Sequence, residues 1–297
     1  MVAINGLMIH VSRGLSGEEV CTLEASTDWD VSDLKWEISE RSDVPEMQQR
    51  LVTKGRVLMN HELISKAFTG GGTHEVIMIR MDPEWAQTIQ DVASGRIRLE
   101  EVDASRRQDR EVVLAAVRRN GLQLEQASKE LRGERDIVLA AVAERGQSLG
   151  FAAEPLRGDH EIVLQAVKKD GLAVRHATDR ARGDATVGRA AVKQNGWALE
   201  LLSDELRADR DLVTVAIEQE GQAIKFVSDD LRDDRDLVIK AVKSNAEALR
   251  VIAPHHKRDP EVVRAASFGV RMRGFGGLNY FKSLLGSTAS LDLSGAM

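Results

Sequence analysis

Few residues in this sequence have the type and spacing that chemistry requires. The seven histidines are scattered, and only His255 and His256 are adjacent. Metal ligands must converge on one point, and neighbouring residues on a helix do not share a face, so we interpret this pair as solvated side chains. The single cysteine, Cys21, falls in a predicted buried strand without a paired basic residue, which favours a small core residue over a nucleophile.

A glycine run is the remaining candidate for chemistry. Gly70, Gly71 and Gly72 lack the following Lys-Ser or Lys-Thr of a phosphate-binding loop, so they are interpreted as a loop tip. No nucleophile, base or metal-ligand set can therefore be named. We expect a protein that is not an enzyme and that needs no cofactor or metal.

The elements around these residues form two different regions. From Asp109 onward the sequence repeats with a period of 25 residues, and each copy is numbered here from its first acid. Position 8 is alanine in every copy, and position 13 is glycine in five of the six full copies. A fixed period of this length indicates stacked supersecondary units. Six full copies and a partial seventh begin at Asp109, Glu134, Asp159, Asp184, Asp209, Asp234 and Asp259.

Each copy is predicted to form two short helices. The acid at position 1 is a candidate N-cap, and positions 4, 5, 8 and 9 are apolar on one helical face. The glycine at position 13 permits the left-handed conformation that ends a helix. In the first copy the second helix is predicted from about Leu122 to Leu131, with Leu124, Ala127 and Leu131 facing inward. Such short helices must bury each other's faces, which predicts an all-α solenoid.

One basic residue recurs at position 24, and it has two readings. It could form a positive ridge for an acidic partner, or it could cap the second helix and pair with the acids that open the next copy. Residues 109–258 carry 25 basic and 26 acidic side chains, a balance that favours local pairing. The row consists of Arg132, Arg157, Arg182, Arg207, Arg232 and Lys257.

Positions 14 and 18 vary from copy to copy, unlike the fixed apolar position 16 between them. They are candidates for a groove that binds a client protein, or else for partly exposed packing positions. The candidate binding residues among them are Phe151, His176, Trp197, Leu201 and Phe226.

Composition limits the partners. The net charge is −6 and aromatic residues make up 4% of the chain, which disfavours nucleic-acid binding. No apolar run approaches the roughly 20 residues of a membrane helix, and the first residues lack the pattern of a secretory signal. We expect a cytoplasmic protein, with the nucleus as the alternative compartment, and protein partners rather than nucleic acid or membrane. The oligomeric state is not predicted.

The first region has a different pattern. A hairpin around Leu15–Gly17, a helix with Val31, Leu34 and Ile38 on its inner side, and strands near Leu51 and over residues 76–79 predict a compact α+β unit. The order and spacing of these elements, and above all the segment QQRLVTKGRVL over residues 48–58, resemble the ubiquitin family across residues 7–81.

This resemblance implies a β-grasp fold and an apolar surface read by receptors. By position the surface maps onto Val52 and onto one of Ile77, Met78 or Ile79, because the glycine loop leaves the register of the last strand open by one residue. Two departures are notable: Arg56 stands where ubiquitin has its main chain-forming lysine, and no terminal Gly-Gly follows the last strand. Both indicate an embedded ubiquitin-like module rather than a conjugated modifier.

The repeats, in runs such as residues 109–136, resemble the "domain of unknown function 4116" family across at least six copies. That resemblance implies a fold and no activity. We therefore expect a ubiquitin-like domain over residues 1–81, a degenerate capping repeat over 82–108, the array over 109–268, and a C-terminal cap with a disordered tail over 269–297.

The expected function is a non-catalytic adaptor. Its ubiquitin-like module recruits ubiquitin receptors or the proteasome, and its solenoid binds a client protein. The alternative is a structural subunit or scaffold of a larger assembly, without a role in the ubiquitin pathway.

Overall fold

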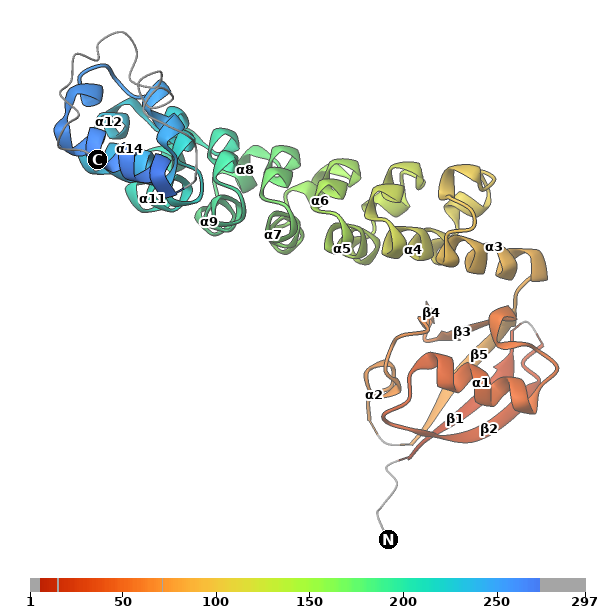
Figure 1. The fold of residues 1–297 in the computed structure, drawn as a ribbon. Helices are drawn as coiled ribbons and strands as arrows, with labels where there is room; N and C mark the ends of the chain where they lie inside the picture. The colour runs from red at the N-terminus through yellow and green to blue at the C-terminus, as the bar shows by residue number, and fades with distance from the viewer. Residues whose placement is uncertain (1–5, 15, 71, 273–297) are drawn as a thin grey trace. The chain divides into compact units, whose positions relative to one another are not determined.

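The computed structural model describes residues 6–14, 16–70 and 72–272, with the side chains of 268–272 left out. The chain divides into two compact units, Met1–Ser94 and Gly95–Met297. The elements of each unit are drawn in Figure 1.

The first unit is built on a five-stranded sheet with the order β2-β1-β5-β3-β4. The two central strands, β1 and β5, are parallel, whereas β1–β2, β3–β5 and β3–β4 are antiparallel. A hairpin, a crossing helix and a return to the sheet centre together define a β-grasp fold, as predicted. The strands are β1 (Gly6–Arg13), β2 (Glu19–Ser26), β3 (Gln49–Thr53), β4 (Arg56–Val57) and β5 (Thr73–Arg80).

The core of this unit lies between the sheet and helix α1 (Val31–Arg41). Asp30 caps the helix: its side chain accepts a hydrogen bond from the Asp33 backbone amide, and the Asp33 side chain accepts one in return from the Asp30 backbone amide. Val31, Leu34 and Ile38 are fully buried, which confirms the predicted inner face. The buried Gln49 side chain donates hydrogen bonds to the backbone oxygens of Lys35 and Val44, so the start of β3 is fixed to the middle of α1 and to the segment that follows the helix.

Short helices complete the unit: the 3-10 helix η1 (Glu46–Gln48), α2 (Ile64–Ala67) and α3 (Pro83–Ser94). The boundary between the units, after Ser94, falls inside the segment 82–108 that the sequence division treats as a capping repeat. Within that segment, Val92 and Leu99 are buried. It also contains two 3-10 helices, η2 (Leu99–Glu101) and η3 (Arg106–Gln108).

The second unit is a row of stacked repeats, as predicted. Positions 2–11 of each copy form a ten-residue α-helix that packs against the same helix of the next copy. Asp109 and its equivalents accept hydrogen bonds from the first backbone amides of these helices, which confirms the predicted caps, but Glu134 makes no such bond. The helices are α4 (Arg110–Arg119), α5 (Arg135–Glu144), α7 (His160–Lys169), α9 (Ala185–Gln194), α11 (Arg210–Gln219), α13 (Arg235–Ser244) and, longer, α14 (Pro260–Met272).

The second half of each copy is not one helix, and that part of the prediction is wrong. Positions 13–18 form a 3-10 helix, the backbone is extended near position 19, and a separate helical turn follows. Gly121, Leu124 and Ala127 are buried at a spacing of three residues, which is the period of a 3-10 helix rather than of an α-helix. The predicted inward residues Leu124, Ala127 and Leu131 are nevertheless all buried.

The bounds of these pieces repeat with the array. The 3-10 helices are η4 (Gly121–Gln126), η6 (Gly146–Phe151), η7 (Gly171–His176), η8 (Gly196–Leu201), η9 (Gly221–Phe226) and η10 (Ala246–Arg250). The final turns are η5 (Leu131–Gly133), α6 (Glu154–Arg157), α8 (Asp179–Arg182), α10 (Asp204–Arg207), α12 (Asp229–Arg232) and η11 (His256–Arg258).

The glycine at position 13 has a different role from the predicted one. None of these glycines has a positive φ, so the prediction that they end a helix in the left-handed conformation is wrong. A Cβ on Gly171 or on Gly196 would lie 2.5 Å from the backbone oxygen of position 8 in the next copy, Ala191 or Ala216. Glycine is required because two backbones approach each other too closely for any side chain.

Among the described residues, every helix is too short or too polar to cross a lipid bilayer. The predicted C-terminal cap and tail lie outside the described residues, except for the end of α14.

We predict that Gly171→Ala lowers the free energy of unfolding by about 1–3 kcal/mol, because the new methyl group overlaps the Ala191 carbonyl. The matched control is Gly183→Ala, whose Cβ would meet nothing closer than 3.7 Å at a position where the fourth copy already has Ala208. Urea denaturation followed by circular dichroism measures both variants. Equal loss of stability in the two would contradict the close backbone approach.

We also predict that a fragment of residues 95–297 folds into a helical array, because each repeat buries its apolar face against its neighbours. Circular dichroism and a cooperative thermal melt are the measurements. A spectrum dominated by coil would contradict the division into two units.

Candidate interaction surfaces

The outer face of the sheet, opposite α1, carries an apolar row. Val52 on β3 is directly paired with Ile77 on β5, and Ile79 follows two residues later on the same face. Ile77 and Ile79 are 42% and 43% exposed, and Val52 is half-buried. Opposite residues of an antiparallel pair place their Cβ atoms about 5 Å apart, so these side chains form one patch, called here the Val52 patch.

The pairing of β3 with β5 decides the register that the sequence leaves open. Met78 is 2% exposed and belongs to the core of the first unit, so it is excluded from the patch. Leu51 and Met78 are paired on the inner face, just as Val52 and Ile77 are paired on the outer one. The alternation of side chains along a strand therefore makes Ile77 and Ile79, and not Met78, the neighbours of Val52.

Two features around this patch bear on conjugation. Arg56 forms an ion pair with Glu62 at 2.7 Å, and this hydrogen-bonded contact raises the pKa of Arg56, so the guanidinium stays charged. After β5 the chain enters α3 directly: the Asp82 carboxylate accepts hydrogen bonds from the amides of Glu84 and Trp85. No free glycine carboxylate stands at the end of the β-grasp fold.

The variable positions of the repeats meet across neighbouring copies. Position 14 of one copy contacts position 18 of the next: Trp197 packs edge-on against Phe226 at 5.9 Å, and Gln147 hydrogen-bonds His176 at 2.9 Å. Lys225 Nζ lies 4.8 Å from the Trp197 ring and 4.5 Å from the Phe226 ring. These contacts are cation–π interactions at a half-buried surface.

The predicted client-binding residues are thus partly engaged in packing. Phe151, His176, Trp197, Leu201 and Phe226 are all half-buried on the 3-10 helices, which pack against one another along the array. Burial, with the nearby charges of Arg175 and Arg157, lowers the pKa of His176 and keeps its ring neutral at pH 7. Of these five residues, the structure brings Trp197 and Phe226 into direct ring contact.

The ion pairs follow another pattern than the predicted one. At position 24, Arg182, Arg207 and Arg232 pair with the acid three residues earlier in their own helical turn, not with the next copy. At these three positions the basic residue therefore closes its own turn, so the pairing is local, but the predicted partners in the next copy are wrong.

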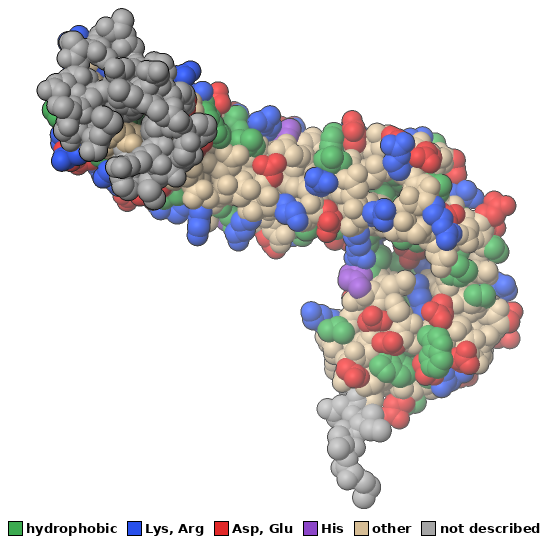
Figure 2. All heavy atoms as spheres, in the orientation of Figure 1, with side chains coloured by type: hydrophobic (Ala, Val, Ile, Leu, Met, Phe, Trp, Pro, Cys, Tyr) green, Lys and Arg blue, Asp and Glu red, His purple; other side chains and the backbone are tan. Residues whose placement is uncertain are grey.

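The residue that links consecutive copies is at position 2. Arg135 contacts Asp159 and Glu161 of the next copy, and Arg235 likewise contacts Asp259 and Glu261. The hydrogen bond from Arg235 lowers the pKa of Asp259 to about 2. Figure 2 shows basic and acidic side chains interspersed along the visible face of the array. Such exposed pairs each stabilise little, and they favour the register of stacking.

The sequence also offered the cysteine, the glycine run and the adjacent histidines as candidates for chemistry. Cys21 is half-buried against the core of the first unit, and burial raises the pKa of its thiol, which disfavours the reactive thiolate. Gly70 and Gly72 have positive φ and lie in a turn before β5. His256 is 6% exposed, so the interpretation of His255 and His256 as a solvated pair is wrong for His256.

The strand order and the stacked units define the class of protein: a ubiquitin-like β-grasp domain followed by a solenoid of helical repeats. The model of the family described as "Domain of unknown function (DUF4116)" matches residues 109–157, 134–180, 189–232 and 209–257, so the array contains repeats similar to that family. None of the curated proteins matches this chain.

Solved structures similar to the first unit are themselves ubiquitin-like. The UBL domain of Plasmodium falciparum Dsk2 is 25% identical, covering 25% of this chain and 97% of its own, with a TM-score of 0.23. Ubiquitin of Caldiarchaeum subterraneum is 18% identical, covering 26% of this chain and 96% of its own, with a TM-score of 0.25. A structure of ATBAG1 in complex with HSP70 has a chain that is 8% identical, covering 63% of this chain and 98% of its own, with a TM-score of 0.27.

We predict that Trp197 and Phe226 stabilise the array through their mutual contact. In a double-mutant cycle of Trp197→Ala and Phe226→Ala, the coupling energy should be about 0.5–1.5 kcal/mol, the value of an edge-to-face aromatic pair. Urea denaturation of the four proteins measures it. Phe151→Ala with Phe226→Ala, at the same position of the second and fifth copies, serves as the control cycle, for which we expect additivity; a coupling near zero in the first cycle would contradict the packing role.

Proposed function

We propose that this protein is a non-catalytic adaptor that binds ubiquitin receptors through the Val52 patch, while its repeat array binds another protein. The observation that carries the proposal is the exposed apolar row of Val52, Ile77 and Ile79 on the open face of a β-grasp sheet. Isoleucine side chains exposed to this extent, side by side with another apolar residue, are typical of a recognition surface.

The covalent context supports recognition rather than conjugation. The strand that carries Ile77 and Ile79 runs into α3, so the domain has no free carboxyl terminus to attach to a target. An embedded module of this kind can act only through non-covalent binding.

The partner proposed for the Val52 patch is a ubiquitin receptor, including those of the proteasome. The array is proposed as the client-binding part, because its half-buried variable positions differ from copy to copy whereas its core does not. The Trp197, Lys225 and Phe226 cluster is its most distinctive local surface.

The test is the affinity of the full chain for purified ubiquitin-receptor domains, measured by isothermal titration calorimetry. We predict that Val52→Asp weakens binding at least about thirtyfold, or about 2 kcal/mol, because the complex would desolvate a carboxylate at the centre of the patch. Circular dichroism checks the fold.

The matched control is Ser65→Asp, which adds the same charge at an exposed position of α2 in the same domain. It should bind like the wild type. If folded Val52→Asp binds equally well, or if the wild type binds no receptor domain, recognition through this patch is wrong. The alternative of a structural subunit then takes its place.

A further inference from the structure

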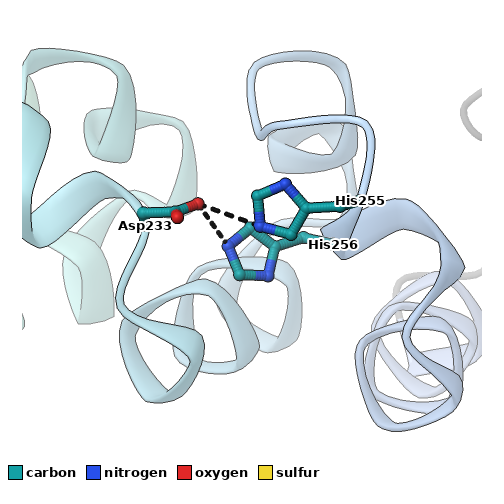
Figure 3. A group of neighbouring side chains, drawn as sticks. All are labelled: Asp233, His255 and His256. Carbon is teal, nitrogen blue, oxygen red and sulfur yellow. Dashed lines mark hydrogen bonds and ion pairs between the residues drawn. The ribbon is translucent and has the colours of Figure 1, made fainter.

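Three potential metal ligands converge near the end of the described array. Figure 3 shows the Asp233 carboxylate facing both imidazole rings of His255 and His256. Asp233 Oδ1 lies 3.0 Å from His255 Nε2 and 2.9 Å from His256 Nε2. One ligand atom from each of the three residues lies within 4.8 Å of the other two.

The cluster joins two consecutive copies. Asp233 is the residue after α12 in the fifth copy, whereas His255 immediately precedes η11 of the sixth and His256 is its first residue. The two histidines do not lie within a regular α-helix, so the rule that neighbours face apart does not apply to them. Their ring centroids are 4.1 Å apart.

Comparison of the copies shows that this cluster is a local departure from the repeat. Position 23, where His256 stands, is otherwise Leu or Ala: Leu131, Leu156, Ala181, Leu206 and Leu231. Position 25, where Asp233 stands, is Gly133, Gly158, Gly183 and Ala208 in the preceding copies.

Packing of the solenoid therefore does not require these side chains. The His256 side chain is only 7% exposed, so a polar ring has replaced an apolar one at a buried site. Burying a polar ring is unfavourable unless it has a partner, and the carboxylate that partners it comes from a position where the four preceding copies have glycine or alanine. His256 and Asp233 both depart from the repeat, and they are in contact with each other beside a second histidine, which points to a bound ligand.

The chemistry of the set selects the ligand. Imidazole nitrogens with one carboxylate suit zinc and similar transition metals, whereas magnesium and calcium prefer all-oxygen sets. Two ligands of a tetrahedral zinc, each about 2.0–2.1 Å from the ion, lie about 3.3 Å apart, so the observed 2.9 and 3.0 Å separations need only small adjustments. We propose that Asp233, His255 and His256 bind a divalent transition-metal ion such as Zn²⁺, which links the fifth and sixth copies and keeps its remaining coordination position for water or a partner's ligand.

The test is Zn²⁺ titration of the untagged full chain by calorimetry, with Co²⁺ absorption as a report of the ligand set. We expect one Zn²⁺ per chain in the wild type and an affinity at least about tenfold lower in His256→Leu and in Asp233→Gly. Both substitutions restore the residue found in other copies, so they should preserve the fold. His255→Ala changes an exposed ring and provides a third variant in which packing is not at issue.

The matched control is His160→Arg, which removes the other His–Asp pair between copies, His160 Nδ1 to Asp184 Oδ2 at 3.4 Å, and introduces the arginine that four copies have at that position. It should bind Zn²⁺ like the wild type. Zn²⁺ should also raise the Tm of the wild type and not that of His256→Leu. Failure of the wild type to bind one Zn²⁺, or an affinity equal to that of the wild type in His256→Leu, Asp233→Gly and His255→Ala, would overturn the proposal and leave a hydrogen-bonded cluster only.

Discussion

The array depends on one close contact, repeated along its length: the backbone of position 13 lies against the carbonyl of position 8 in the next copy. At Gly171 and Ala191 there is no space for a Cβ between them. This contact sets how closely two copies stack, and the small, fully buried Ala at position 8 permits the same spacing between the long helices. That spacing between copies also determines which other groups can meet: the apolar side chains of the core, the ion pairs of position 2, and the side chains of positions 14 and 18.

Periodicity revealed the architecture well, because each position of the repeat meets the same environment in every copy. The β-grasp order and the inner residues of α1 also followed from the sequence. The local backbone geometry of the repeat did not follow from the sequence. Glycine serves both left-handed turns and close approaches, so Gly121 alone could not distinguish them. The second helix could not be predicted correctly because the spacing of Leu124, Ala127 and Leu131, three and then four residues, is that of an α-helix, whereas Ala127 lies in extended backbone between two 3-10 helices.

The candidate sites show the same division between local and spatial information. Val52 could be placed from the QQRL segment, but the choice among Ile77, Met78 and Ile79 required the pairing of β3 with β5. The convergence of His255 and His256 on Asp233 could not be derived from helix spacing, since the acid belongs to another copy. Its signal was present in the sequence as a histidine at a position that is leucine or alanine in the other copies.

The residue at position 12 has a double role with a consequence for the length of the array. Asn120 ends α4 by donating its amide to Ala116 O, and its side chain accepts from the Leu122 amide to begin η4. The two helices therefore meet without a connecting loop, and an inserted residue would separate the cap from the helix it caps. A single-residue insertion or deletion at that junction would therefore break the cap, whereas the addition of a whole copy preserves it.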